Sequence, residues 1–140
     1  MANLVATALA VVAFASSGDG QLVLGSKSFG DLRYGIGWGT TQPRVVYNGG
    51  DPSGKVWHIR WSDWGGTVAL GGGLTWLHRP QGGYYTTGAE IELRAFGIGR
   101  CSSKGPRAYL HLKVRVPARP GGPLGPWYLW GGSHSICRST

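Results

Sequence analysis

Basic side chains concentrate in the last third of this 140-residue chain, and cationic groups of this kind bind anions. The first 92 residues carry six basic and six acidic residues, so their formal charge is zero. The remaining residues carry eight basic side chains and no acidic one, which accounts for the whole net charge of +8. Such a segregated surface attracts polyanions: nucleic acid, acidic glycans, cell-wall polymers or anionic lipid heads. The candidate anion-binding residues are Arg94, Arg107, His111, Lys113, Arg115 and Arg119. The alternative is that the charge only keeps an exported protein soluble.

Aromatic side chains are the second candidate for ligand contact, because a flat ring stacks on a sugar or a base. The chain has seven tryptophans. Those of residues 57–76 divide into an expected core pair, Trp57 and Trp61, and an edge pair, Trp64 and Trp76. The candidates for exposed contact lie beside proline and glycine near the C-terminus: Trp127, Tyr128 and Trp130.

Signatures of catalysis and metal binding are missing from the sequence. It contains no GxSxG nucleophile elbow and no HExxH zinc motif, and its four histidines lack ligand spacing. Glu90 and Glu92 are two residues apart, but strand alternation explains them as a solvated face. We therefore expect no catalytic residue, no metal and no cofactor, and a hydrolase ranks last among the functions considered.

An apolar run at residues 4–15 resembles the central part of a signal peptide. It is shorter than the roughly 20 residues that span a bilayer, and it ends in the small-x-small pattern Ala13-Phe14-Ala15. No lysine or arginine precedes it, and the alternative is a buried N-terminal strand or helix. We predict a signal peptide at residues 1–15, a secreted protein and no transmembrane segment.

Export favours a disulfide between the two cysteines, because cysteines of extracellular proteins usually pair. No CxxC or CxH spacing supports a metal site. We predict a Cys101–Cys137 disulfide. By the chain-entropy model, a bond that closes a loop of this length stabilises the folded protein by about 4 kcal/mol.

Short apolar runs separated by glycine and proline predict strands. Hydrophobic residues make up 41% of the chain, enough for a core, while 26 glycines and eight prolines exclude long helices. Alternation is cleanest in residues 89–96, where alanine, isoleucine and leucine face inward. It also predicts Trp57, Ile59 and Trp61 on one face of a strand at 56–64. A strand at 108–116 would turn Tyr109, His111, Lys113 and Arg115 to solvent. Other expected strands are 34–39, 44–47, 67–76, 127–130 and 133–137, with a turn at 48–54.

Seven or so short strands at this spacing predict an all-β fold, an antiparallel β-sandwich, with a small β-barrel as the alternative. Residues 16–30 would form an N-terminal arm or a first short strand. Residues 31–140 would form the single sandwich domain.

Several motifs together resemble small secreted proteins of actinobacteria. They are the run Asn48-Gly49-Gly50-Asp51-Pro52-Ser53-Gly54, then Trp61-x-x-Trp64-Gly65, Gly71-x-Gly73 and the late cysteine pair. The similarity covers about residues 35–137 and implies an exported bacterial protein. It implies no activity, so no functional residue is carried over.

Two functions remain after these exclusions. The first is a non-catalytic secreted binding module whose basic C-terminal third contacts a polyanion or the cell envelope. The second is a carbohydrate-binding or inhibitor-like module that acts through its exposed tryptophans.

Overall fold

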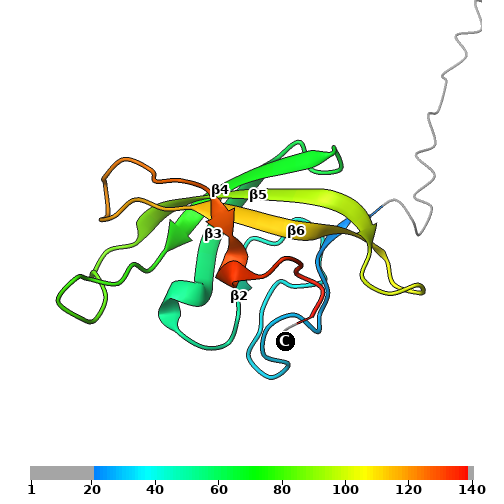
Figure 1. Cartoon of the computed structure of the whole chain (residues 1–140), viewed down its shortest axis with the longest axis horizontal. Helices are drawn as coiled ribbons and strands as arrows, with labels where there is room; N and C mark the ends of the chain where they lie inside the picture. Colours follow the sequence, from blue (N-terminus) through cyan, green and yellow to red (C-terminus); the bar gives the residue numbers. More distant parts are fainter. Residues whose placement is uncertain (1–20, 139–140) are drawn as a thin grey trace, which may run out of the picture.

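The structure, a computed structural model, describes residues 21–138 and contains one mixed sheet of seven strands (Figure 1). The order along the sheet is β1-β6-β5-β4-β3-β2, and β7 also pairs with β6. β1 is parallel to β6, and every other pair of strands is antiparallel. The strands are β1 (Val23–Leu24), β2 (Val46–Tyr47), β3 (Lys55–Ser62), β4 (Val68–Thr75), β5 (Ala89–Arg100), β6 (Arg107–Arg115) and β7 (Tyr128–Leu129). Two 3-10 turns complete the secondary structure, η1 (Pro52–Gly54) and η2 (Trp130–Gly132).

The all-β class is confirmed, and the sheet curls into a half-barrel. Its inner face is covered by the loops of residues 25–54 and by the C-terminal segment, which lie beneath the sheet in Figure 1. The expected sandwich would have a second sheet in that place, whereas all seven strands within residues 21–138 belong to one sheet. Residues 34–39 do not form the expected strand, because Gly37 and Gly39 take the left-handed φ values +86° and +74°. Only the bridge between Ile36 and Tyr47 remains of it.

The core lies between the sheet and these loops. In β5 the predicted inward residues, Ala89, Ile91, Leu93 and Ala95, are all at most 2% exposed, which confirms the alternation there. The loops and the C-terminal segment below the sheet contribute Phe29, Trp38, Trp130 and Ile136, while the edge strands β1 and β2 and the residue before β1 add Leu24, Val46 and Leu22.

The expected faces of β3 were wrong in one respect. The pairing of β3 with β4 shifts between Trp57 and Arg60, and His58 has a φ of +54°. This β-bulge changes the phase of the strand, so that Val56 and Ile59 are both buried. Trp57 consequently turns to the outer face, where its ring packs 4.8 Å from that of Trp76. It is half-buried rather than part of the core.

In β4 the small residues face the core, and Leu70 on the other side is 41% exposed. A Cβ on Gly71 would lie 2.9 Å from the ring of Trp61. Trp61 is half-buried, packs against the core and donates its indole N–H to the carbonyl oxygen of Pro43 (2.8 Å). The volume of this indole therefore requires a glycine opposite it.

Tyr109 was expected to face solvent, but it is completely buried. Its partner in β5 is Ile98, and the preceding residue, Gly97, has a φ of +71°, so the alternation of β5 breaks there. Ala95 and Ile98 therefore both pack on the core, although they are three residues apart. The Tyr109 hydroxyl accepts a hydrogen bond from the Gly65 N–H (2.8 Å) and donates one to the Gly66 carbonyl (2.6 Å).

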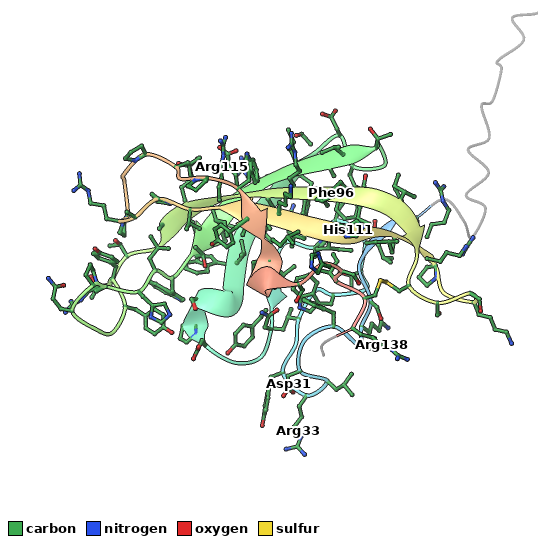
Figure 2. The ribbon with its side chains drawn as sticks, in the orientation of Figure 1. Asp31, Arg33, Phe96, His111, Arg115 and Arg138 are labelled. Atoms are coloured by element: carbon green, nitrogen blue, oxygen red, sulfur yellow. A yellow bond between two sulfur atoms is a disulfide. The ribbon has the colours of Figure 1, made fainter. Side chains whose placement is uncertain are left out.

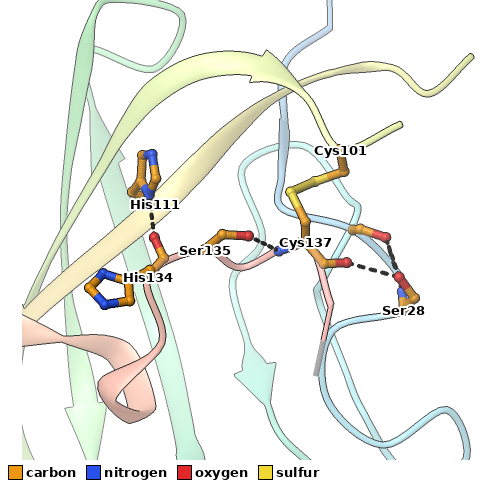
Figure 3. The surroundings of a disulfide bond; sticks show 7 residues. Ser28, Cys101, His111, His134, Ser135 and Cys137 are labelled. Carbon is orange, nitrogen blue, oxygen red and sulfur yellow. Dashed lines mark hydrogen bonds between the residues drawn. A yellow bond between two sulfur atoms is a disulfide. The ribbon is translucent and has the colours of Figure 1, made fainter. Parts of the chain in front are cut away.

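The predicted disulfide joins Cys101, at the end of β5, to Cys137 (Figure 3). Residues 133–137 form no strand; instead they lie along β6 through single hydrogen bonds. The Ile136 N–H donates to Leu110 (2.9 Å), and its carbonyl accepts from the Ser26 N–H (3.1 Å). The Ser28 hydroxyl donates to the Cys137 carbonyl (2.9 Å). The bond thus fastens the C-terminal segment beneath the sheet.

Candidate functional site

Three of the predicted anion-binding residues lie together on the outer face, the side of β3–β6 that points away from the core. Arg94 of β5 is directly opposite Lys113 of β6, and Arg115 follows two residues later on the same side. Gly72, where an added Cβ would meet no atom within 4 Å, lies between Arg60 of β3 and Glu92 of β5 on this face. Figure 2 shows Arg115 on the side of the sheet away from the loops.

The charge of this face is partly balanced by Glu92. Its carboxylate accepts hydrogen bonds from Arg115 Nε (3.2 Å) and Nη2 (2.8 Å), with side-chain exposures of 34% for Arg115 and 32% for Glu92. An ion pair with this exposure contributes about 0–1 kcal/mol of stability. Its main effect is to orient the guanidinium. Arg94 and Lys113 make no ion pair among the described residues, so their charges remain for a ligand.

Trp127 packs against the same cations. Its ring lies 4.6 Å from the Arg115 guanidinium carbon and 5.5 Å from that of Arg94. Cation–π contacts at such distances contribute about 0.5–1 kcal/mol at exposed sites. The half-buried indole therefore acts as a support for the two arginines as well as an aromatic surface.

His111 is adjacent in β6, but its ring contacts the C-terminal segment. Nδ1 is hydrogen-bonded to the carbonyl oxygen of His134 (Figure 3). A carbonyl only accepts, so Nδ1 carries a proton. The ring also stacks on Phe96 with its centroid 5.1 Å away. With Nδ1 as the donor, Nε2 of the neutral ring can only accept, so the ring of His111 offers no N–H group to an anion.

The remaining two predicted basic residues lie elsewhere. Arg107 begins β6 opposite Arg100, at the far end of the β5–β6 hairpin. Arg119 is in the loop between β6 and β7, where its carbonyl accepts the Gly122 N–H. The structure therefore brings together only part of the basic set.

Trp130 was predicted to be an exposed contact, but it is buried, with 4% of its surface exposed. Its ring packs edge-on against Trp38, 5.6 Å between centroids, and its indole N–H donates to Asn48 Oδ1 (3.0 Å). Tyr128, by contrast, is 48% exposed. Burial raises the pKa of the Tyr128 hydroxyl above its usual value, so the group remains a neutral hydrogen-bond donor at physiological pH.

A cavity of about 680 Å³ opens on the inner side of the same sheet. Its apolar wall includes Ile91, Val114 and Val116, with Tyr128 beside them. The opposite wall is polar and consists of Asp31 and the 48–54 turn. Sequence reasoning predicted that turn but not the cavity; the clustering of polar residues and glycine in the turn was the available signal.

Residues 21–138 include no group of three or more His, Cys, Asp or Glu placed to hold a metal ion. They also include no helix of the length and hydropathy needed to cross a membrane. The predicted signal peptide at residues 1–15 lies outside the described residues.

Comparison with known proteins returned no matching family model, no matching curated protein and no matching solved structure. The resemblance to small secreted actinobacterial proteins stays a prediction.

Proposed function

We propose that this chain is a non-catalytic, exported binding module that holds a polyanion on the outer face of its sheet. The observation that carries the proposal is the placement of Arg94, Lys113 and Arg115 on neighbouring strands around Trp127. Phosphate, sulfate and carboxylate groups repeat along a polymer, and a group of cations on neighbouring strands can meet several of them at once. The ring of Trp127 adds a surface on which a sugar or base can stack.

Export is part of the proposal and is supported by the disulfide, since such bonds persist in oxidising compartments. An exported polyanion-binding module would meet acidic glycans or cell-wall polymers outside the cell. These polymers are the partners that we propose.

Salt-dependent binding to two probes, heparin and inorganic polyphosphate, tests this function. Heparin presents sulfate and carboxylate groups, whereas polyphosphate presents only phosphate, so the pair distinguishes the sources of negative charge. We expect the double variant Arg94→Glu/Lys113→Glu to lose affinity and to lower the log–log salt slope by about 2, one for each lost contact.

The matched control is Arg107→Glu/Arg119→Glu, which changes the net charge by the same amount away from the outer face. We expect this variant to bind nearly as well as the unaltered protein. If both double variants lose affinity equally, the effect is one of net charge alone and the proposed site is wrong. Elution of the unaltered protein below physiological ionic strength would also reject the proposal.

A further inference from the structure

The cavity beneath the sheet has two chemically different walls, and this division identifies a class of ligand. The apolar wall is formed by Ile91 of β5 and Val114 of β6, both 2% exposed, and the neighbouring Thr75 of β4 adds no free polar group because its hydroxyl donates to the Lys55 carbonyl (2.7 Å). Tyr128 stands at its edge with nearly half of its surface free. A volume of about 680 Å³ is within the usual range of small-molecule sites, about 300–1,000 Å³.

The polar wall offers both donors and acceptors. Asn48 must turn its oxygen toward Trp130, because an indole N–H only donates. Its NH₂ group is therefore left as a donor, and it makes no hydrogen bond among the described residues. The backbone N–H groups of Gly49 and Gly50 are likewise unpaired in this part of the chain. Acceptors come from the Asp51 carboxylate and from Oδ2 of Asp31, whose Oδ1 already accepts the N–H groups of Arg33 (2.7 Å) and Tyr34 (3.1 Å).

This wall is held rigidly before any ligand arrives. Asn48 receives the Asp31 N–H on its carbonyl (2.8 Å) and donates its own N–H to Gly54 (3.1 Å). Gly49 has a φ of +90°, and a Cβ there would lie 2.6 Å from the Cβ of Asp31. Hydrogen bonds within the turn and to two segments outside it, at Asp31 and Trp130, therefore hold its conformation, and little ordering entropy opposes binding.

Charge narrows the choice of ligand. The lining contains two carboxylates, one histidine (His78) and no lysine or arginine, so anions are disfavoured in the cavity although the net charge of the whole protein is +8. A simple cation would use the carboxylates but not the unpaired N–H donors. A purely apolar ligand would leave the whole polar wall without partners. A pyranose ring has an apolar C–H face and an edge of hydroxyls that both donate and accept, and it matches both walls.

We propose that this cavity is a binding site for a neutral saccharide, with the sugar's C–H face toward Tyr128 and its hydroxyls toward the 48–51 turn. The site is separate from the outer face and does not rest on polyanion binding there.

Titration calorimetry and tryptophan fluorescence with three neutral probes test the proposal: maltotriose, cellotriose and N-acetylchitotriose. We expect at least one to bind with a Kd at or below about 1 mM, independently of salt between 50 and 500 mM. Tyr128→Ala should weaken that binding about tenfold, since an aromatic stacking contact is lost. Asp51→Ala, an exposed change outside every strand, should weaken it several-fold through loss of a charge-assisted hydrogen bond.

Two controls complete the test. Lys113→Glu on the outer face should leave sugar affinity unchanged, and both cavity variants should retain the wild-type thermal unfolding temperature within a few degrees. No saturable binding of any probe up to about 10 mM would overturn the proposal. So would spermidine binding in preference to the sugars, or a Tyr128→Ala variant with unchanged affinity for the sugar that binds.

Discussion

Removing the hydroxyl of Tyr109 should lower the unfolding free energy at neutral pH, because two hydrogen bonds are lost. The hydroxyl makes two hydrogen bonds to the turn between β3 and β4, at Gly65 and Gly66. A typical intramolecular hydrogen bond contributes about 0.5–1.5 kcal/mol net. Both glycines are exposed, so water can replace the lost partner in the variant. We expect Tyr109→Phe to lose about 1–2 kcal/mol of unfolding free energy.

The same substitution should alter the pH dependence of stability. Burial raises the pKa of Tyr109 above 10.0, although the hydrogen bond from Gly65 partly opposes the shift. A group whose pKa is raised by folding contributes its stability below the unfolded pKa, and this contribution falls as pH rises toward the folded value. Phenylalanine cannot ionise. The difference in stability between the two proteins should therefore be largest near pH 7 and shrink above pH 10.

Urea unfolding followed by tryptophan fluorescence at pH 7, 9 and 10.5, with the disulfide intact, measures both effects. Tyr128→Phe is the control: its pKa is raised too, but its hydroxyl makes no hydrogen bond within residues 21–138. We expect it to lose less than about 0.5 kcal/mol at pH 7. The reasoning is refuted if Tyr109→Phe is as stable as the unaltered protein at pH 7, or if the difference grows with pH.

Two further predictions concern the disulfide and the packing of the sheet. Cys101→Ser, or reduction of the Cys101–Cys137 bond, should lower the unfolding free energy by up to about 4 kcal/mol in urea titration; a loss below 1 kcal/mol would mean that hydrogen bonds alone hold the C-terminal segment. Gly71→Ala should cost about 1–3 kcal/mol because the new Cβ meets the Trp61 ring. Gly72→Ala, one residue later in open space, should be neutral or slightly stabilising. Equal thermal unfolding temperatures for the two alanine variants would contradict this account of the sheet.

The predictability of each strand depended on whether its backbone stayed regular. In β5 the alternation up to Ala95 is undisturbed, and the sequence identified both faces correctly. In β3 a single left-handed residue, His58, moved Trp57 to the opposite face. Left-handed φ values are uncommon outside glycine, and although histidine adopts them more often than most residues, its presence in a β-rich run does not by itself mark such a position. Gly97 had the same effect on Tyr109, although there the residue type at least permits the conformation.

The two candidate sites also differ in how far they can be predicted from the sequence. The basic outer face follows from alternation within two strands, so residues such as Arg94 and Lys113 could be identified from the sequence. The cavity requires Asp31, the turn at Asn48 and the segment around Trp130 to meet. These contacts join parts of the chain up to 82 residues apart. Local patterns carry no information about which distant loops meet, and the burial of Trp130 could not be foreseen for that reason.

Alternation also explains how one thin sheet can carry two binding surfaces that are tested separately. Ile91 and Val114 line the cavity, while the next residues in their strands, Glu92 and Arg115, form the ion pair on the outer face. A substitution on one face leaves every side chain of the other in place. Electrostatic influence across the sheet is limited, because charges at the surface are screened over about 8 Å at physiological ionic strength. The Arg94→Glu/Lys113→Glu variant should therefore lose polyanion binding while its cavity keeps the affinity for a neutral sugar, and a parallel loss of both would mean that the two faces form one site.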